Sequence, residues 1–235
     1  MSQLNPLPPN IGIPEQFLGP GLWEAFVQIV LKITVQAYCN MREKRIVQRG
    51  WEEDHFTINL EDYIRPLAFK HTMNITVVAR TKTHTDEMKT GEITAKRAKE
   101  IDLKLWGRWE RYNDIYFAWE CKKIASRQDD EKYKDLINEY IKEGMFRFLD
   151  EEYSAYLGNA GMLGYVLDGS ISDIVKGINQ SMISSLRDRR LNETNNLYQA
   201  SPIDNFSDIY TSSHKREATA STVTLHHLFL TFDFT

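Results

Sequence analysis

Apolar and polar residues alternate along this chain with a helical period in some stretches and a strand period in others. Residues 22–38, LWEAFVQIVLKITVQAY, are long and apolar enough to suggest a membrane span. The strongly polar side chains of this stretch recur every four residues, at Glu24, Gln28, Lys32 and Gln36. Because residues four apart lie on one stripe of a helix, the pattern predicts an amphipathic core helix with one solvated edge.

The segment after this helix predicts a second helix followed by strands. Residues 58–69 carry apolar side chains at helical spacing, and Pro66 predicts that this helix is short or irregular. Residues 82–99 are polar and are expected to form a loop. Runs that are β-branched or that alternate apolar with polar residues predict three strands, at 74–81, 100–108 and 115–124.

The rest of the chain completes an α/β pattern. Residues 129–153 place apolar side chains on one helical face and acidic ones at the amino end, where the helix dipole favours them. A buried strand, a helix capped by Ser170, a polar region and a last strand follow at 161–169, 171–186, 187–221 and 222–234. The core order is therefore α, β, β, β, α, β, which predicts a mixed central sheet flanked by helices, with a helix added before it and a helix and strand after it.

Composition narrows the class of protein. With 42% hydrophobic and 26% charged residues, the chain is typical of one globular domain, expected at 21–235. Residues 1–20 hold five of the seven prolines and are expected to form an extended arm. A net charge of -4 argues against a nonspecific polyelectrolyte binder, although basic residues gather in short runs. Two cysteines and no visible secretory signal predict a cytoplasmic protein without a membrane segment.

Two neighbouring strands each carry a carboxylate where an apolar run is expected. If strands 100–108 and 115–124 form an antiparallel hairpin centred near Arg111, Asp102 lies opposite Glu120, and Lys122 lies two residues further on the same face. Two carboxylates so close repel unless a cation lies between them. Mg²⁺ is held by such carboxylates, and a lysine beside it could orient or deprotonate the attacking water, or neutralise charge on the pentavalent phosphate.

Spacing alone does not establish this site, because an acid two residues before a lysine also occurs at 87–89, 102–104 and 130–132. Glu120 and Lys122 differ from those pairs because they end an apolar strand, 18 residues after another buried acid. A salt-bridged pair at a strand end remains the structural alternative.

The core order, with Asp102 followed by Glu120-Cys121-Lys122, resembles the PD-(D/E)xK nuclease superfamily, the fold of many restriction endonucleases, over about residues 50–170. By this resemblance Asp102, Glu120 and the Cys121 carbonyl would bind Mg²⁺ or Mn²⁺, and Lys122 would be the catalytic lysine. A further glutamate from the first core helix would be Glu53 or, as second choice, Glu61. The proline of the family signature is replaced by an isoleucine, which removes no ligand.

The resemblance implies a restriction-endonuclease-like core and a metal-dependent endonuclease acting on nucleic acid, with DNA as the first choice. Residues 140–148 and 161–169 are similar to uncharacterised members encoded among bacterial defence genes, which implies an effector of antiviral defence. The alternative is a non-catalytic subunit that keeps this fold for assembly or nucleic-acid binding, as a homo-oligomer or within a multi-protein complex.

Other residues are weaker candidates. Arg147 could reach a phosphate or pair with Glu143 on its helix, and His214 and Arg216 could contact a phosphate. His226 and His227 point to opposite faces of the last strand and cannot chelate one metal together. The Cys121 thiol is expected to be a small buried group and not a nucleophile.

Overall fold

The structure, a computed structural model, describes residues 19–82, 99–107, 115–127, 131, 133, 135–150, 153, 157–184, 195–216 and 219–234. Residues 1–18 of the predicted Pro-rich arm and most of the loop expected at 82–99 lie outside these residues, and Pro20, predicted as the end of the arm, begins the first helix. The helical elements are α2 (Pro20–Glu43), α3 (Glu53–Lys70), α5 (Leu136–Glu139), the π-helix η1 (Tyr140–Met145), α6 (Phe146–Leu149) and α7 (Ile171–Ser184). The strands are β1 (Thr76–Lys82), β2 (Glu100–Trp106), β3 (Phe117–Ala125), β4 (Asn159–Asp168), β5 (Tyr198–Gln199), β6 (Ile209–Lys215) and β7 (Thr222–Thr231).

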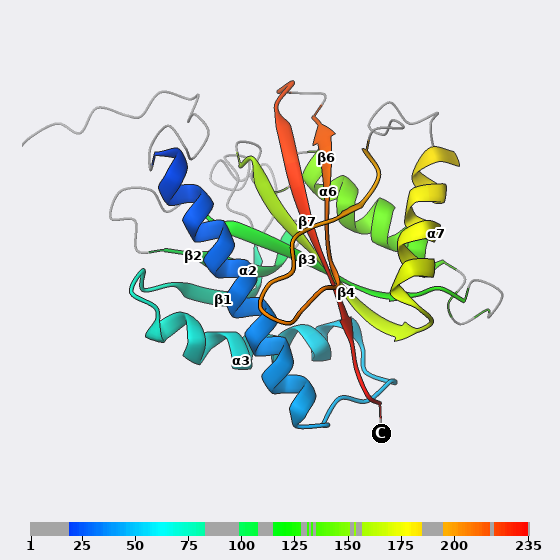
Figure 1. The fold of residues 1–235 in the computed structure, drawn as a ribbon, viewed down its shortest axis with the longest axis horizontal. Coiled ribbons are helices and arrows are strands. Elements are labelled where there is room, and N and C mark those ends of the chain that lie inside the picture. Colours follow the sequence, from blue (N-terminus) through cyan, green and yellow to red (C-terminus); the bar gives the residue numbers. More distant parts are fainter. Residues whose placement is uncertain are drawn as a thin grey trace, which may run out of the picture.

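The strands form one seven-stranded mixed sheet in the order β1-β2-β3-β4-β7-β6-β5. The pairs β1–β2 and β2–β3 are antiparallel, and the pairs β3–β4 and β4–β7 are parallel. The pairs β7–β6 and β6–β5 are again antiparallel. The predicted α, β, β, β, α, β order is therefore present, from α3 through β3 and the helical segment 136–149 to β4. The mixed central sheet with flanking helices is confirmed (Figure 1).

Helices cover both faces of this sheet. On one face, Phe56 of α3 stacks on Tyr165 of β4 with ring centroids 4.8 Å apart, and α2 crosses in front (Figure 1). On the other face, Tyr140 of η1 bonds His227 of β7, which pairs in register with Met162. Met162 and Tyr165 are an odd number of residues apart on one strand, so they mark opposite faces.

Helix α2 is amphipathic in the predicted way. Its four polar positions, Glu24, Gln28, Lys32 and Gln36, are all exposed, while most of the residues between them are buried. Among the described helices, none combines the length and the apolar character that a bilayer crossing requires. This helix packs its apolar sides onto α3 and the sheet and leaves one edge in water.

Helix α3 differs from the prediction, because it runs unbroken for 18 residues with Pro66 inside it. Pro66 and Asp62, whose carbonyl would accept the missing amide bond, are both exposed, so water can satisfy that carbonyl. The helix also begins at Glu53, five residues before the apolar pattern that predicted it. Its additional first turn carries Glu53 toward the sheet, which matters for the site described below.

Two further elements depart from the sequence pattern. The helix expected at 129–153 contains a π-helical turn, Tyr140–Met145, within its described part 136–149. Strand β6 lies in the region 187–221 that was expected to be polar and without strands. Its inward positions include Ser212 and His214, which are buried but polar, so the run lacks the apolar alternation that predicts a strand.

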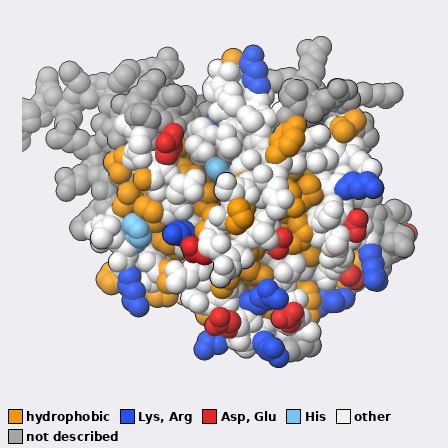
Figure 2. Space-filling model, in the orientation of Figure 1, with side chains coloured by type: hydrophobic (Ala, Val, Ile, Leu, Met, Phe, Trp, Pro, Cys, Tyr) orange, Lys and Arg blue, Asp and Glu red, His pale blue; other side chains and the backbone are white. Residues whose placement is uncertain are grey.

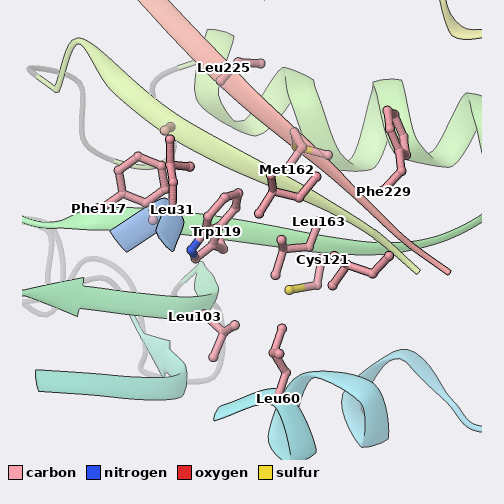
Figure 3. Packing of buried hydrophobic residues seen from close by; sticks show 14 of the residues in the cluster. Leu31, Leu60, Leu103, Phe117, Trp119, Cys121, Met162, Leu163, Leu225 and Phe229 are labelled. Carbon is pink, nitrogen blue, oxygen red and sulfur yellow. The ribbon is translucent and has the colours of Figure 1, made fainter. Parts of the chain in front are cut away.

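The core lies between the sheet and the helices on each side. Leu60 of α3 points toward Cys121 of β3, and both side chains are fully buried (Figure 3). Trp119 and Leu103 continue this layer onto β2 and β3. Because Cys121 faces α3, its neighbours Glu120 and Lys122 project toward the opposite face of the strand.

Candidate active site

The candidate site forms where β2 and β3 diverge. Leu103 pairs with Trp119, Lys104 with Ala118 and Leu105 with Phe117, a register centred on residue 111, as predicted. The next pair in this register is Asp102 and Glu120. The ladder ends just before this pair, and Asp102 Oδ2 accepts a hydrogen bond from the Cys121 amide at 2.8 Å. This bond to the Asp102 side chain takes the place of a backbone ladder bond and holds the carboxylate against β3.

Lys122 lies at the centre of the predicted set. Its Nζ is 3.0 Å from Glu120 Oε1, and it donates to Glu53 Oε1 and to the Cys121 carbonyl, each at 2.9 Å. Glu53 Oε2 also accepts the Lys123 amide at 3.2 Å. The first-choice glutamate of the first core helix therefore reaches the site. The second choice, Glu61, lies two turns further along α3 and pairs with Arg65 at 2.7 Å.

The helical segment after β3 packs closely on this lysine. A Cβ placed on Gly144 of η1 would lie 2.5 Å from Met162 Cε and 3.5 Å from Lys122 Cγ. The absence of a side chain at residue 144 thus lets the backbone of η1 approach the sheet beside the Lys122 stem. This close packing also brings α6, with Arg147, over the acidic cluster.

Arg147 joins the site through Glu120. Its Nη1 is 3.4 Å from Glu120 Oε1, and the same nitrogen donates to the Tyr153 hydroxyl, which donates to the Glu100 carbonyl. The sequence allowed Arg147 either to reach a phosphate or to pair with Glu143. Because Arg147 contacts Glu120 and lines the pocket, the structure supports the first role. The phosphate contact itself stays a prediction.

Arg80 is a charged residue of the site that the sequence pattern did not single out. Its Nη1 lies 3.2 Å from Asp102 Oδ1 and 3.0 Å from Asp54 Oδ1, and its Nε lies 2.5 Å from Glu100 Oε1. The available signal was a charged residue interrupting the apolar strand predicted at 74–81, on the strand that would neighbour Asp102.

These side chains line a pocket of about 340 Å³. All nine of its described lining residues are charged, five basic and four acidic, and they include Lys82, Lys99 and Glu100 beside those above. On the face shown in Figure 2, apolar and other side chains lie among the Lys, Arg, Asp and Glu side chains of the described residues. Among the described residues that line the pocket, no uncharged side chain separates the charges.

Burial changes the proton affinity of the acidic cluster. Removal from water raises the pKa of Asp102 and of Glu53, and burial together with the Asp102 charge raises the pKa of Glu120 to about 8. Burial alone would lower the pKa of Lys122, but Glu120, Glu53 and Asp102 together raise it above its ordinary value. Lys122 is therefore an ammonium ion at neutral pH, and Glu120 holds a proton more readily than a free carboxyl.

The donor set fits a small oxygen-seeking cation. Asp102, Glu120, Glu53 and the Cys121 carbonyl all offer oxygen, the ligand type that Mg²⁺ and Mn²⁺ prefer. Among the described residues, the buried Glu120 Oε2 has no hydrogen-bond partner. No three His, Cys, Asp or Glu side chains of the described ranges form a ready metal cage, however. Lys122 contacts three of the four predicted ligands itself, so a metal ion would have to share or replace those contacts.

Two predicted phosphate contacts are wrong in this structure. His214 and Arg216 are both 1% exposed and lie outside the pocket. His214 bonds Ser212, and Arg216 donates to the carbonyls of Phe148 and Leu157, where it satisfies the end of α6. The expected inertness of Cys121 agrees with its burial, which raises the pKa of the thiol well above its ordinary value.

Comparison of the chain with models of protein families, with curated proteins and with solved structures gave no match.

Proposed function

We propose that this protein is a metal-dependent endonuclease that hydrolyses phosphodiester bonds of nucleic acid. The observation that carries the proposal is the meeting of Asp102, Glu120 and Lys122 with Glu53 in one charged pocket. Four separated positions of the sequence, each expected at a nuclease site, lie in one pocket at the point where two strands diverge. A chance salt bridge at a strand end would require two of them and not four.

The fold supports the same proposal. A helix, three antiparallel strands, a helical segment and a strand parallel to the third are present in that order. This is the arrangement expected of a restriction-endonuclease-like core, and the site lies on the strands where the PD-(D/E)xK pattern would put it. Fold alone does not give function, so the charged pocket carries more weight.

The residues would divide the chemistry as follows. Asp102, Glu120, the Cys121 carbonyl and Glu53 would hold Mg²⁺ or Mn²⁺. When bound, such a cation supplies a Lewis acid and a water of lowered pKa. Lys122, an ammonium ion in the metal-free protein, would donate to the attacking water or to the charge that develops on the phosphate. Arg147 would hold a phosphate oxygen from the other side of the pocket.

The substrate is proposed to be DNA, and the setting a cytoplasmic antiviral response in bacteria. Both follow from the family resemblance of the sequence and not from the pocket, which offers charge complementarity to any phosphodiester. A multi-protein complex or a homo-oligomer would fit the same setting.

A second candidate is a non-catalytic subunit that keeps the fold for assembly or nucleic-acid binding. One observation favours it: Lys122 already neutralises Glu53 and Glu120, so the cluster is a self-contained ion network without a metal. Such a network can be purely structural, since buried ion pairs need only one another and their hydrogen bonds.

Incubation with supercoiled plasmid, linear duplex, single-stranded DNA and RNA decides between the two candidates. Each substrate is tested with Mg²⁺, with Mn²⁺ and with chelator. The proposed enzyme cuts at least one substrate, needs the metal, and loses activity in Asp102→Asn. A wild-type protein that binds nucleic acid and cuts none of these substrates under any metal condition would support the non-catalytic subunit.

A further inference from the structure

The backbone of Arg80 has an unusual conformation for a strand. Five non-glycine residues of the described chain have positive φ, and Arg80, at 54°, is the one that lies inside a strand. A side chain with a Cβ is disfavoured in this left-handed region, so surrounding contacts must hold it there. Such strain gathers at functional sites more often than in ordinary strands.

The contacts that hold Arg80 come from the acidic side of the pocket. The β1–β2 register runs from Ala79 opposite Leu103 to Thr81 opposite Ile101, which leaves Arg80 opposite Asp102. The guanidinium then meets Asp102 of β2, Asp54 of α3 and Glu100 of β2. Three carboxylates from two elements converge on one arginine.

Both oxygens of the Asp102 carboxylate have partners, and Arg80 is one of them. One carboxylate oxygen, Oδ2, accepts the Cys121 amide, and the other, Oδ1, lies 3.2 Å from Arg80 Nη1. A divalent cation at this carboxylate would lie close to the guanidinium and repel it. The Arg80 side chain is 41% exposed, against 5% for that of Asp102, so it sits at the mouth of the pocket where a substrate would enter.

We propose that Arg80 competes with the divalent cation for Asp102 and, once displaced, binds the substrate phosphate at the mouth of the pocket. This inference rests on the proposed function, and it names a substrate-binding residue that the family pattern does not supply. The planar guanidinium matches a phosphate with two parallel hydrogen bonds, which suits it to this second position. The same residue thereby links occupation of the metal site to capture of the substrate.

The competing explanation for the strained residue is protection of the sheet edge. Strand β1 is an edge strand, and a local distortion with a charged side chain discourages pairing with another molecule. That explanation predicts a change in association between molecules when Arg80 is replaced, and no change in metal affinity.

The test uses Arg80→Gly, which removes the side chain and accepts the positive φ without strain. Arg80→Lys, which keeps a charge but not the fork, guards against misfolding of the first variant. Arg65→Ala is the control, because Arg65 also pairs with two acids of α3 but lies away from the pocket. Mn²⁺ affinity is measured by titration calorimetry, and molecular mass in solution is measured by light scattering. The rate of cleavage of a duplex DNA oligonucleotide is measured at saturating Mn²⁺.

We expect Arg80→Gly to bind Mn²⁺ about tenfold more tightly, since a competing cation is removed, yet to cleave about tenfold or more slowly. Arg80→Lys keeps Mn²⁺ affinity near wild type and cleaves more slowly, and Arg65→Ala matches wild type in both. If Arg80→Gly binds Mn²⁺ no more tightly than wild type, Arg80 does not compete with the cation for Asp102. If its molecular mass in solution also changes, protection of the sheet edge explains the strained residue instead.

The outcomes also separate this inference from the proposed function. A wild type that binds Mn²⁺ but cleaves no DNA overturns the proposed function and the phosphate contact, while the affinities still decide the competition at Asp102. A wild type that cleaves, with Arg80→Gly unchanged in affinity and rate, leaves the function standing and overturns the role of Arg80.

Discussion

Two regions of this sheet bury polar groups, and they do so in opposite ways. The charged pocket at the β1–β2–β3 end holds five basic and four acidic side chains. The other region, here called the neutral network, lies between η1 and β6–β7. It links Tyr140 to His227 at 2.9 Å, His227 to Ser212 at 2.8 Å and Ser212 to His214 at 2.7 Å.

The difference agrees with the proposed function, in which the charged pocket carries the chemistry and the neutral network contributes to stability. Burial lowers the pKa of His214 to about 4 and holds that of His227 well below its ordinary value, so both rings are neutral and can donate and accept along one chain of hydrogen bonds. The charged pocket instead holds Lys122 as an ammonium ion and contains the strained Arg80. Among the described residues, both regions contain a buried atom without a hydrogen-bond partner, Glu120 Oε2 in the pocket and His214 Nδ1 in the network, so charge and backbone strain are what separate them. Such strain is tolerated where a function requires it.

Replacement of Lys122 is expected to have the largest effect on the charged pocket. We expect Lys122→Ala to reduce the cleavage rate by on the order of a hundred- to a thousandfold, as for the loss of one electrostatic group at a reacting phosphate. Lys123→Ala is the matched control, because Lys123 faces the other side of the strand and pairs with Glu52 at 3.0 Å. Single-turnover rates at saturating enzyme check the effect.

Lys122 also neutralises two carboxylates, so its variant is expected to be less stable as well. Rates are therefore compared at a temperature where circular dichroism shows both variants folded. Equal rates for the two lysine variants would show that Lys122 is an ordinary strand-end lysine, and the non-catalytic candidate would replace the enzyme.

The two regions should also give stability opposite dependences on pH. The folded-state pKa of Glu120 is raised to about 8 from an ordinary 4.5, so its contribution is full below about pH 4.5 and is lost as pH rises through 8. The pKa of His214 is lowered from 6.5 to about 4, so its contribution is present above about pH 6.5 and is lost as pH falls through 4. The two contributions offset each other between about pH 4.5 and 6.5, and the metal-free protein should be most stable in this range.

Glu120→Gln isolates the alkaline side of this profile, since it keeps the shape of the protonated acid. In chelator, the urea midpoint of wild type should fall between pH 6.5 and 8, where the His214 contribution is already complete, and that of the variant should fall less. One pKa unit corresponds to about 1.4 kcal/mol, so a part of the shift is enough to measure. Parallel profiles for the two proteins would mean that Glu120 is ionised in the fold.

Metal binding should stabilise the charged pocket and leave the neutral network unaffected. A cation that binds only the folded protein adds about 2.7 kcal/mol at a hundredfold excess over its dissociation constant. We expect the melting temperature of wild type to rise with Mn²⁺, and that of Asp102→Ala to stay constant. His227→Asn, in the neutral network, should lower the melting temperature without metal, and Mn²⁺ should still raise it as in wild type. The same response in Asp102→Ala and wild type would place the metal elsewhere.

Much of the fold and the centre of the site could be predicted because they depend on local periodicity. Counting outward from residue 111 gave the pair Asp102 and Glu120, and alternation then put Lys122 on their side. Glu53 could only be a first choice, because the first turn of α3 is polar and shows no apolar pattern. That turn is helical because tertiary contacts hold it, among them the Lys123 amide on Glu53.

The remaining features depend on contacts that periodicity does not encode. Strand β6 was missed because its buried residues Ser212 and His214 are polar, and Ser212 bonds His214 and His227 of β7. Arg80 was missed because a left-handed residue inside a strand leaves no mark in the sequence unless it is glycine. The π-turn of η1 was missed because one extra residue in a turn barely changes a short helical pattern.

The smallest expected effect is confined to the neutral network. Ser212→Ala removes the hydroxyl that bonds both His214 and His227, and it leaves two buried ring nitrogens without that partner. Leaving buried polar groups unsatisfied costs about 1–3 kcal/mol, so the free energy of unfolding should fall by about that amount. Ser213→Ala is the control, because the neighbouring serine is exposed on the other face of β6. Both proteins should cleave DNA at the wild-type rate where they are folded, since neither residue lines the charged pocket. Slower cleavage by folded Ser212→Ala would mean that the neutral network is coupled to the chemistry through η1, whose Gly144 packs beside Lys122.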